Sequence, residues 1–303
     1  MKSDLINKVP KTKGTLIPNA NIADSSWFQV GGKAELLFEP KDEDDLHYFL
    51  KNLDEEIDIF IIGGASNILI RDGGIPGVTI KLNRLYNQVI KKNDGIIVGS
   101  SVKNMYLANY AKKNQLSGYE FLSGIPGTIG GSIRMNSGAY GRCISDVLDK
   151  IEVIDGVRGI YEINKKKLKM KYREIIFPKK TIILNAVFKK LIKSKNDIEN
   201  TINLIKAKRN DSQPVKALTG GSTFKNPAGM KAWKLIEAAG CRGMTIGGAK
   251  ISEIHTNFII NYNNATAGDI EKLGEEVRNK VYNEFGVNLE WEIIRIGKTI
   301  KEF

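Results

Sequence analysis

The sequence predicts an α+β protein in two parts, and three observations carry this prediction. The chain has 303 residues, about twice the length of a typical domain. Short apolar runs typical of strands are interspersed with amphipathic segments typical of helices. A polar, charged run at 193–197 separates two such sets. We therefore expect one domain at 1–195 and a second at 196–303.

Strands outnumber helices in the first part. The run AELLF at 34–38 is typical of a strand, and 42–53 carries apolar residues at helical spacing after Pro40. A second helix is expected at 103–113. The other expected strands are 57–62, 68–70, 78–82, 95–98, 148–154, 159–163 and 181–189.

The second part begins with an expected helix at 198–209 and a loop at 213–227. A short helix at 232–239 is stopped by Gly240, and 269–285 has the apolar stripe of a long amphipathic helix. Strands are expected at 259–262 and 289–296.

Charge and cysteine usage exclude several classes of protein. The 46 Lys and Arg exceed the 34 Asp and Glu by 12, but no aromatic platform accompanies them, so an anionic small molecule fits better than nucleic acid. Cys143 and Cys241 lie far apart and outside any CxxC pair, which argues against disulfides and structural zinc. Without a secretory signal or an apolar run long enough for a bilayer, we expect a cytoplasmic protein with no membrane partner.

Two glycine-rich loops are the candidates for ligand binding. The first, GGASN at 63–67, follows a strand, and its backbone N–H groups could hold a pyrophosphate; a tight turn is the alternative. It lacks the following helix of a Rossmann loop and the Gly-Lys-Ser/Thr of a Walker A loop. The second, at 124–141, has six glycines in eighteen residues, which suggests backbone wrapped around a flat or charged ligand.

Seven motifs in sequence resemble the UDP-N-acetylenolpyruvoylglucosamine reductase family. They are SSWFQVGGKAELLFEP (25–40), IIGGASNILIRDGGIPGVTIKL (61–82), SGIPGTIGGSIRMNSGAYG (123–141), KYREIIF (171–177), GGSTFKNP (220–227), HTNFIIN (255–261) and FGVNLEWEIIRIG (285–297). The resemblance implies an FAD-binding domain of the vanillyl-alcohol-oxidase (PCMH) type, with α+β lobes at about 1–84 and 85–195. A C-terminal α+β substrate-binding domain would follow.

The resemblance also implies noncovalently bound FAD, with NADPH as hydride donor and no metal. Neither His47 nor His255 lies at a glycine loop, where a covalent flavin link would need one. The family has Gly where Ala65 stands, and a methyl group there requires a negative φ. The residues implied for FAD are Gly63, Gly64, Ala65, Ser66, Asn67, Ile125, Gly127, Gly130, Gly131, Asn136 and Gly138.

Arg173, Ser222 and Glu292 match the family's catalytic positions. Reducing an enolpyruvyl group needs a hydride at C3, which reduced flavin supplies, and stabilisation of the enolate, for which Arg173 is suited. It also needs a proton at C2, implied to come from the Ser222 hydroxyl. Glu292 would share the enolate charge or relay the proton, which requires a raised pKa. Taken alone, these residues would be a turn serine, a surface arginine and an edge-strand acid.

Substrate contacts and two departures complete the comparison with the family. Tyr140, Lys225 and Asn226 match positions that would bind the UDP-sugar, and Arg142 is a weaker candidate. Ile294 stands where many relatives have Arg, and Arg295 is shifted by one residue, to the other side of a strand. The chain also lacks the tyrosine-bearing insertion of one subgroup, so it resembles the shorter subgroup.

Two other classes keep some of these features. A flavin oxidase acting with O2 would share the glycine loops but would not need Ser222 or Glu292. A basic nucleic-acid-binding protein would be colourless after FAD reconstitution and would bind with steep salt dependence. We expect the reductase, acting on a small-molecule substrate as a monomer.

Overall fold

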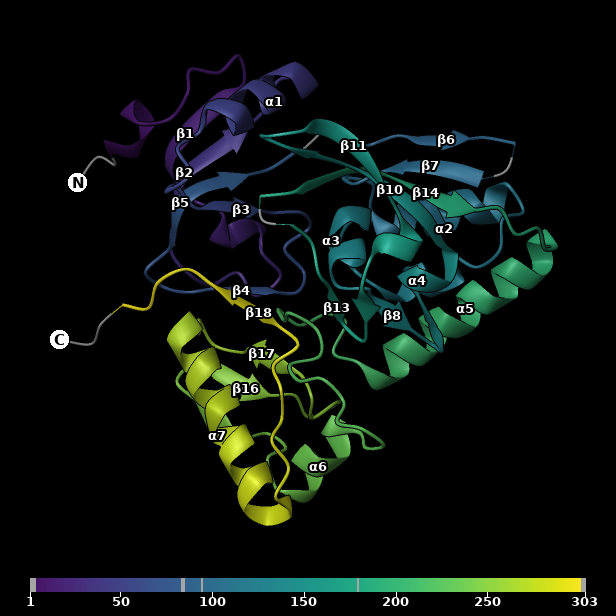
Figure 1. Ribbon diagram of the computed structural model, residues 1–303. Helices are drawn as coiled ribbons and strands as arrows, with labels where there is room; N and C mark the ends of the chain where they lie inside the picture. Colours follow the sequence, from purple (N-terminus) through teal and green to yellow (C-terminus); the bar gives the residue numbers. More distant parts are fainter. Residues whose placement is uncertain (1–3, 83–84, 94, 179, 301–303) are drawn as a thin grey trace. The chain divides into compact units, whose positions relative to one another are not determined.

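The computed structural model describes residues 4–82, 85–93, 95–178 and 180–300 (Figure 1). The chain forms two compact units and passes between them several times. Unit 1 consists of Met1–Pro18, Leu36–Gly64 and Gly77–Arg209; unit 2 consists of Asn19–Glu35, Ala65–Pro76 and Asn210–Phe303. The domain boundary at 195/196 stays a prediction, and the lobe boundary at 84/85 adjoins residues 83–84, which lie outside the described part.

A four-stranded sheet has the strand order β1-β2-β5-β3. Its strands are β1 (Thr15–Ala20), β2 (Ala34–Glu39), β3 (Ile59–Ile61) and β5 (Ile75–Ile80), with β3 parallel to β5. In unit 1, helix α1 (Glu43–Asn52) contributes Leu46, Phe49 and Leu50 to an apolar core with Leu36 and Phe38. Asp42 begins this helix by accepting the Asp45 N–H (2.9 Å), a standard N-cap.

A five-stranded antiparallel sheet in unit 1 has the order β11-β10-β14-β7-β6. Its strands are β6 (Val89–Lys91), β7 (Gly95–Gly99), β10 (Leu148–Asp155), β11 (Gly159–Asn164) and β14 (Ile182–Lys189). Helix α2 (Asn104–Lys113) buries Leu107, Ala108 and Ala111 in the core that this sheet forms. In β14, Ile183, Ala186 and Phe188 are buried in this core, whereas Ile182 and Leu184 are buried in the core that contains helix α1.

The second glycine-rich stretch includes α3 (Ile129–Arg134) and β8 (Gly138–Ala139). The remaining elements are β9 (Arg142–Cys143), α4 (Ile144–Val147), β12 (Met170–Lys171), β13 (Glu174–Ile175), α5 (Lys195–Ser212) and 3-10 helices at Asp4–Asn7, Ala23–Ser25, Glu120–Gly124 and Lys165–Lys167.

Unit 2 is built around helix α7 (Ala267–Phe285), which contacts a sheet of β15 (Thr245–Ile246), β16 (Ala249–Ile251) and β17 (Ile259–Asn261) (Figure 1). Helix α6 (Ala232–Ala238) packs beside α7, and β18 (Ile294–Ile296) pairs in parallel with β4 (Ile68–Ile70). The core includes Phe28, Val30 and Leu69, from segments far away in sequence.

Most expected elements are confirmed, and the differences have local causes. The expected strand 289–296 is regular only from Ile294, since among residues 289–293 only Trp291 makes a β-bridge. The expected loop around Gly130 contains helix α3, because its apolar residues Ile129 and Ile133 are buried in the core. The strands that the sequence did not predict are β1, β6, β8, β9, β12, β13, β15 and β16. Within the described ranges, no helix is long and apolar enough to cross a membrane.

Candidate functional site

The two glycine-rich loops contact each other in unit 1. A Cβ added at Gly64 would lie 2.7 Å from the Gly127 Cα, and one at Gly63 would lie 2.6 Å from the Thr128 hydroxyl oxygen. Side chains at these glycines would therefore push the loops apart. Gly63 is exposed, so the paired loops present backbone at the surface of the unit.

Buried polar side chains form hydrogen bonds and close contacts with the second loop. The Asn104 amide donates to the carbonyls of Ile125 and Pro126 (3.2 Å each) and to the Ser132 hydroxyl (2.7 Å). Gly130 lies over Ser100, because a Cβ there would be 2.9 Å from the Ser100 Cβ. Gly131 is open by comparison, with its nearest neighbour for an added Cβ at 3.7 Å. Within the described residues, the Asn104 carbonyl oxygen and the Ser100 hydroxyl are buried without a hydrogen-bond partner.

The backbone of Ala65 does not have the negative φ that its methyl group was expected to require. Its φ is +48°, in the left-handed region that glycine adopts more readily, so the expectation of a negative φ is wrong. Asn136, Tyr140 and Arg173 also have positive φ, at +41°, +53° and +58°. Strained backbone of this kind clusters at functional sites.

Arg173 is held by the second glycine-rich loop. It is the second residue of the two-residue turn between β12 and β13, and its guanidinium donates to the Gly138 carbonyl (2.8 Å) and lies 5.0 Å from the centre of the Tyr172 ring. The Asn136 amide donates to the Lys171 carbonyl (2.9 Å), and its oxygen accepts the Ser145 N–H (3.0 Å). Asn136 and Gly138, expected at the flavin, thus also anchor the hairpin that carries Arg173.

Ser222 and Glu292 lie on adjoining antiparallel segments of unit 2. Phe224 and Trp291 form an antiparallel β-bridge. On either side of it, the Lys225 N–H donates to the Glu290 carbonyl (2.8 Å) and the Glu292 N–H donates to the Thr223 carbonyl (2.8 Å). Both Ser222 and Glu292 are partly exposed. The buried Thr223 between Ser222 and Phe224 was not foreseen; its hydroxyl accepts the Ile259 N–H (3.1 Å).

Asn67 links the first glycine-rich loop to Glu292. Its side-chain amide donates to the Glu292 carbonyl (3.0 Å), and its own carbonyl accepts the Ile294 N–H (3.0 Å). The family resemblance implies that Asn67 binds FAD, and the sequence does not predict this link because residues 67 and 292 are separated by 224 others. The parallel pairing of β4 with β18 continues from the same point.

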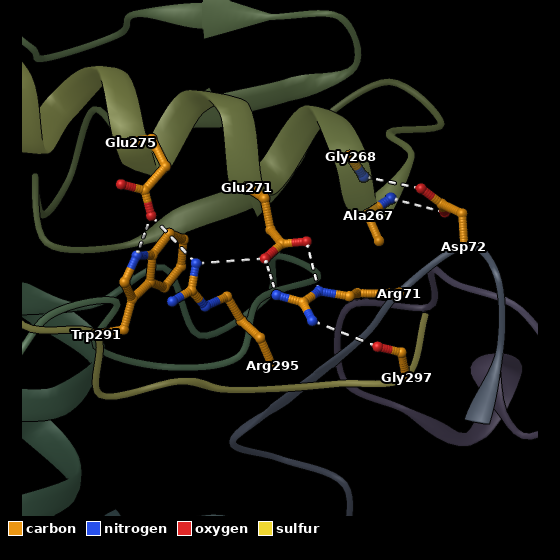
Figure 2. A network of polar contacts seen from close by, with 9 residues as sticks. All are labelled: Arg71, Asp72, Ala267, Gly268, Glu271, Glu275, Trp291, Arg295 and Gly297. Carbon is orange, nitrogen blue, oxygen red and sulfur yellow. Dashed lines mark hydrogen bonds and ion pairs between the residues drawn. The ribbon is translucent and has the colours of Figure 1, made fainter. Parts of the chain in front are cut away.

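Arg295 faces helix α7, on the other side of its strand from the exposed Ile294. Its guanidinium lies 3.3 Å from Glu271 and 3.1 Å from Glu275, and stacks 4.6 Å from the centre of a Trp291 ring (Figure 2). Arg71, just after β4, makes two 3.0 Å bonds to the same Glu271. The hydrogen bond to Glu271 raises the pKa of Arg71, so this arginine is charged at neutral pH.

The expected substrate contacts have local roles in the structure. Lys225 pairs with Glu290 (3.2 Å), and the Asn226 oxygen accepts the Ala232 N–H at the start of α6 (3.0 Å). Tyr140 is 41% exposed. Burial of part of its side chain raises its pKa, and the charge of Arg209 offsets only part of this rise. Their binding roles stay predictions.

The paired loops fit an FAD molecule. Gly63 and Gly131 are exposed, so backbone of both loops can approach a pyrophosphate or a flat ring, and buried polar atoms without partners lie next to the second loop. Across the described part of the chain, no three His, Cys, Asp or Glu side chains gather as a metal site would require.

Comparisons with known proteins agree with this geometry. A family model of the FAD-binding domain matches residues 34–162, and a model of the UDP-N-acetylenolpyruvoylglucosamine reductase C-terminal domain matches residues 213–296. The expectations of FAD and of an FAD-binding domain joined to this C-terminal domain are thereby confirmed.

Relatives cover almost the whole chain. Proteins named UDP-N-acetylenolpyruvoylglucosamine reductase are 47% identical in Rickettsia typhi, over 96% of this chain and 99% of that protein, and 45% identical in Azorhizobium caulinodans, over 95% and 94%. The crystal structure of this reductase from Thermus caldophilus superposes with a TM-score of 0.80 at 28% identity, covering 95% of this chain and 100% of that one. The chain belongs to the UDP-N-acetylenolpyruvoylglucosamine reductase family.

Proposed function

We propose that this FAD-dependent oxidoreductase reduces UDP-N-acetylglucosamine enolpyruvate to UDP-N-acetylmuramate, with NADPH as the hydride donor, in peptidoglycan precursor synthesis. The enolpyruvyl double bond gains a hydride at C3 and a proton at C2, and NADPH becomes NADP⁺. The observation that carries the proposal is the pairing of 223–225 with 290–292, because Ser222 directly precedes the paired segment and so lies on backbone that adjoins Glu292.

Bound FAD supplies the hydride-transfer chemistry between nicotinamide and substrate. The chain's contribution to binding is the backbone of Gly63, Gly64, Gly127 and Gly131, with Ser66, Asn67, Ile125 and Gly130 beside it. Glycine at these positions permits close approach, and backbone N–H groups favour the pyrophosphate anion.

Three side chains act on the substrate in this proposal. Arg173 stabilises the negative charge that develops on the substrate carboxylate, because a guanidinium fork matches two carboxylate oxygens. The Ser222 hydroxyl delivers the proton to C2, since an enolate carbon is basic enough to take it. Glu292 shares the enolate charge or returns a proton to Ser222. Tyr140, Lys225 and Asn226 contact the UDP-sugar.

An anaerobic stopped-flow experiment tests both half-reactions of the proposal. The purified yellow protein is mixed first with NADPH and then with UDP-N-acetylenolpyruvoylglucosamine, and flavin absorbance is followed. We expect bleaching by NADPH and recolouring by the substrate, in a monomeric cytoplasmic enzyme. Flavin that NADPH leaves oxidised, but that a sugar or alcohol reduces, would favour an oxidase. Bleaching without recolouring would rule out this substrate.

A further inference from the structure

Both backbone polar groups of Glu292 are bonded within unit 2. Its N–H donates to Thr223, its carbonyl accepts from Asn67, and two residues later the Ile294 N–H donates back to Asn67. These bonds fix the path of the backbone at Glu292. The rotation of the segment about that path depends on how the flanking residues pack.

Trp291, the residue before Glu292, lies in a slot on helix α7. A Cβ added at Gly274 would lie 2.3 Å from two carbons of the Trp291 six-membered ring, so the helix has room for this ring only because residue 274 is glycine. Glycine in a helix interior is less favourable than alanine, so a glycine at this position has a packing reason. The indole N–H donates to Glu275 (2.8 Å), and the ring packs on Phe224 at 5.1 Å between centres.

A chain of ion pairs lies beside Trp291 (Figure 2). Arg295 stacks on the Trp291 ring and bridges Glu275 to Glu271, and Arg71 holds Glu271 from the end of β4. The Glu271 side chain is 15% exposed and those of Arg71 and Arg295 are each 29% exposed. Half-buried, multiply bonded charges of this kind hold geometry better than single surface pairs do.

We propose that Trp291 is a positioning residue for Glu292. Trp291 is in turn held in place by the slot at Gly274 and by the Arg295 bridge. This inference rests on the proposed function, in which Glu292 acts on the substrate. A tryptophan that cannot enter the slot shifts the adjoining Glu292, whereas hydride transfer from NADPH does not depend on that shift.

The matched test compares Gly274→Ala with Gly268→Ala on the same helix. A Cβ at Gly268 would meet its nearest neighbours at 3.5 and 3.6 Å, which is ordinary contact. In the FAD-loaded enzyme, we expect Gly274→Ala to slow recolouring by the substrate about 10- to 100-fold, since displacements near 1 Å have effects of this size. Bleaching by NADPH should stay within about twofold of the parent rate, a limit that allows for ordinary variation between variants. Gly268→Ala should leave both steps unchanged.

A second readout does not depend on activity. Hydrogen exchange measured by mass spectrometry over residues 290–296 reports the amides that bond to Thr223 and Asn67. We expect faster exchange in Gly274→Ala and parent-like exchange in Gly268→Ala. Adding Trp291→Phe removes the ring atoms that clash, so the double variant should behave like Trp291→Phe alone. Arg295→Lys, which keeps the charge but loses the planar stack, should also slow recolouring while sparing bleaching.

The Glu292→Gln variant separates the catalytic role proposed for Glu292 from the positioning role proposed for Trp291. If Glu292→Gln recolours at the parent rate, the role given to Glu292 in the proposed function is wrong. If Glu292→Gln is slow while Gly274→Ala and Arg295→Lys match Gly268→Ala, the positioning role of Trp291 is wrong and the proposed function stands.

Discussion

Four residues of the candidate site have left-handed backbone. Ala65, Asn136, Tyr140 and Arg173 have positive φ, and each comes from a segment that the family resemblance assigns to cofactor, substrate or catalysis. A left-handed conformation costs roughly 1–2 kcal/mol for a residue with a Cβ. The surrounding hydrogen bonds, such as those of Asn136 to Lys171 and Ser145, compensate for it.

Ala65 allows this strain to be measured. Ala65→Gly relieves the left-handed strain but loses a buried methyl group and makes the unfolded chain more flexible, so we expect the free energy of unfolding to change by less than about 0.5 kcal/mol. The same substitution at Ala108, buried in α2, should cost about 1–2 kcal/mol because no strain is relieved there. Urea denaturation of both variants gives the comparison. Equal losses would mean that Ala65 is not strained.

Ser222→Ala tests the proton donor. We expect bleaching by NADPH at nearly the parent rate and recolouring by the substrate slowed about 10²–10⁴-fold, the usual contribution of a positioned acid. Ser222→Cys, which keeps an ionisable proton, should recover part of the lost rate. Stopped-flow absorbance measures both steps. Equal loss of both would indicate that Ser222 maintains structure instead.

At the level of elements, helix α7 has a fully formed N-terminus. The Thr266 hydroxyl accepts the Asp269 N–H (3.0 Å), and the Asp269 carboxylate accepts the Thr266 N–H (2.9 Å), which is a capping box. Asp72 adds a second carboxylate there, accepting from Ala267 (3.0 Å) and Gly268 (2.9 Å) (Figure 2). Thr266→Ala should therefore destabilise unit 2 by about 1 kcal/mol.

The same cap predicts a pH dependence of stability. Burial raises the pKa of Asp269, but the hydrogen bonds from Thr266 and Gly248 lower it by a larger amount, so the net shift is downward. A carboxyl whose pKa is lower when folded stabilises the protein above its unfolded value, about 3.9, and this contribution is lost as pH falls through the folded value. Asp269→Asn should reduce the loss of stability below about pH 4.

Tryptophan fluorescence measures this effect in the right unit. The chain has three tryptophans, Trp27, Trp233 and Trp291, and all belong to unit 2. Urea unfolding followed by fluorescence between about pH 2.5 and 7 should show a flatter profile for Asp269→Asn. Asp211→Asn, at an exposed acid of the same unit, is the control. Identical profiles for Asp269→Asn and the parent would contradict the prediction.

At the level of the whole molecule, unit 2 is assembled from three separated segments. Phe28 and Leu69 are fully buried in a core whose other members come mostly from residues after 210, and β4 supplies the partner strand of β18. Burying one such side chain stabilises a protein by about 1.5–3 kcal/mol, and whole domains have only about 5–15 kcal/mol of stability.

The C-terminal segment is therefore not expected to fold alone. A fragment of residues 210–303 lacks Phe28, Val30, Leu69 and β4. We expect an unfolded or aggregated fragment by circular dichroism and by amide NMR dispersion, under conditions where the full chain is folded. A dispersed spectrum with cooperative unfolding would show that the three segments are not all required.

The sequence by itself determined the α+β class, most helices and strands, and the residues that match the family. Helices α1, α2, α6 and α7 follow from apolar periodicity and capping residues, which are local properties. The glycine loops were identifiable because closely spaced glycines in an apolar context have few purely structural uses.

Only the tertiary structure decided how distant segments combine. The link from Asn67 to Glu292, the slot for Trp291 at Gly274 and the bridge from Arg295 to α7 join residues with no shared local pattern. The left-handed φ of Ala65 was also beyond the sequence, because alanine predicts the opposite conformation. Local propensity acts over a few residues, whereas these features arise when packing brings separate segments into contact and overrides that propensity.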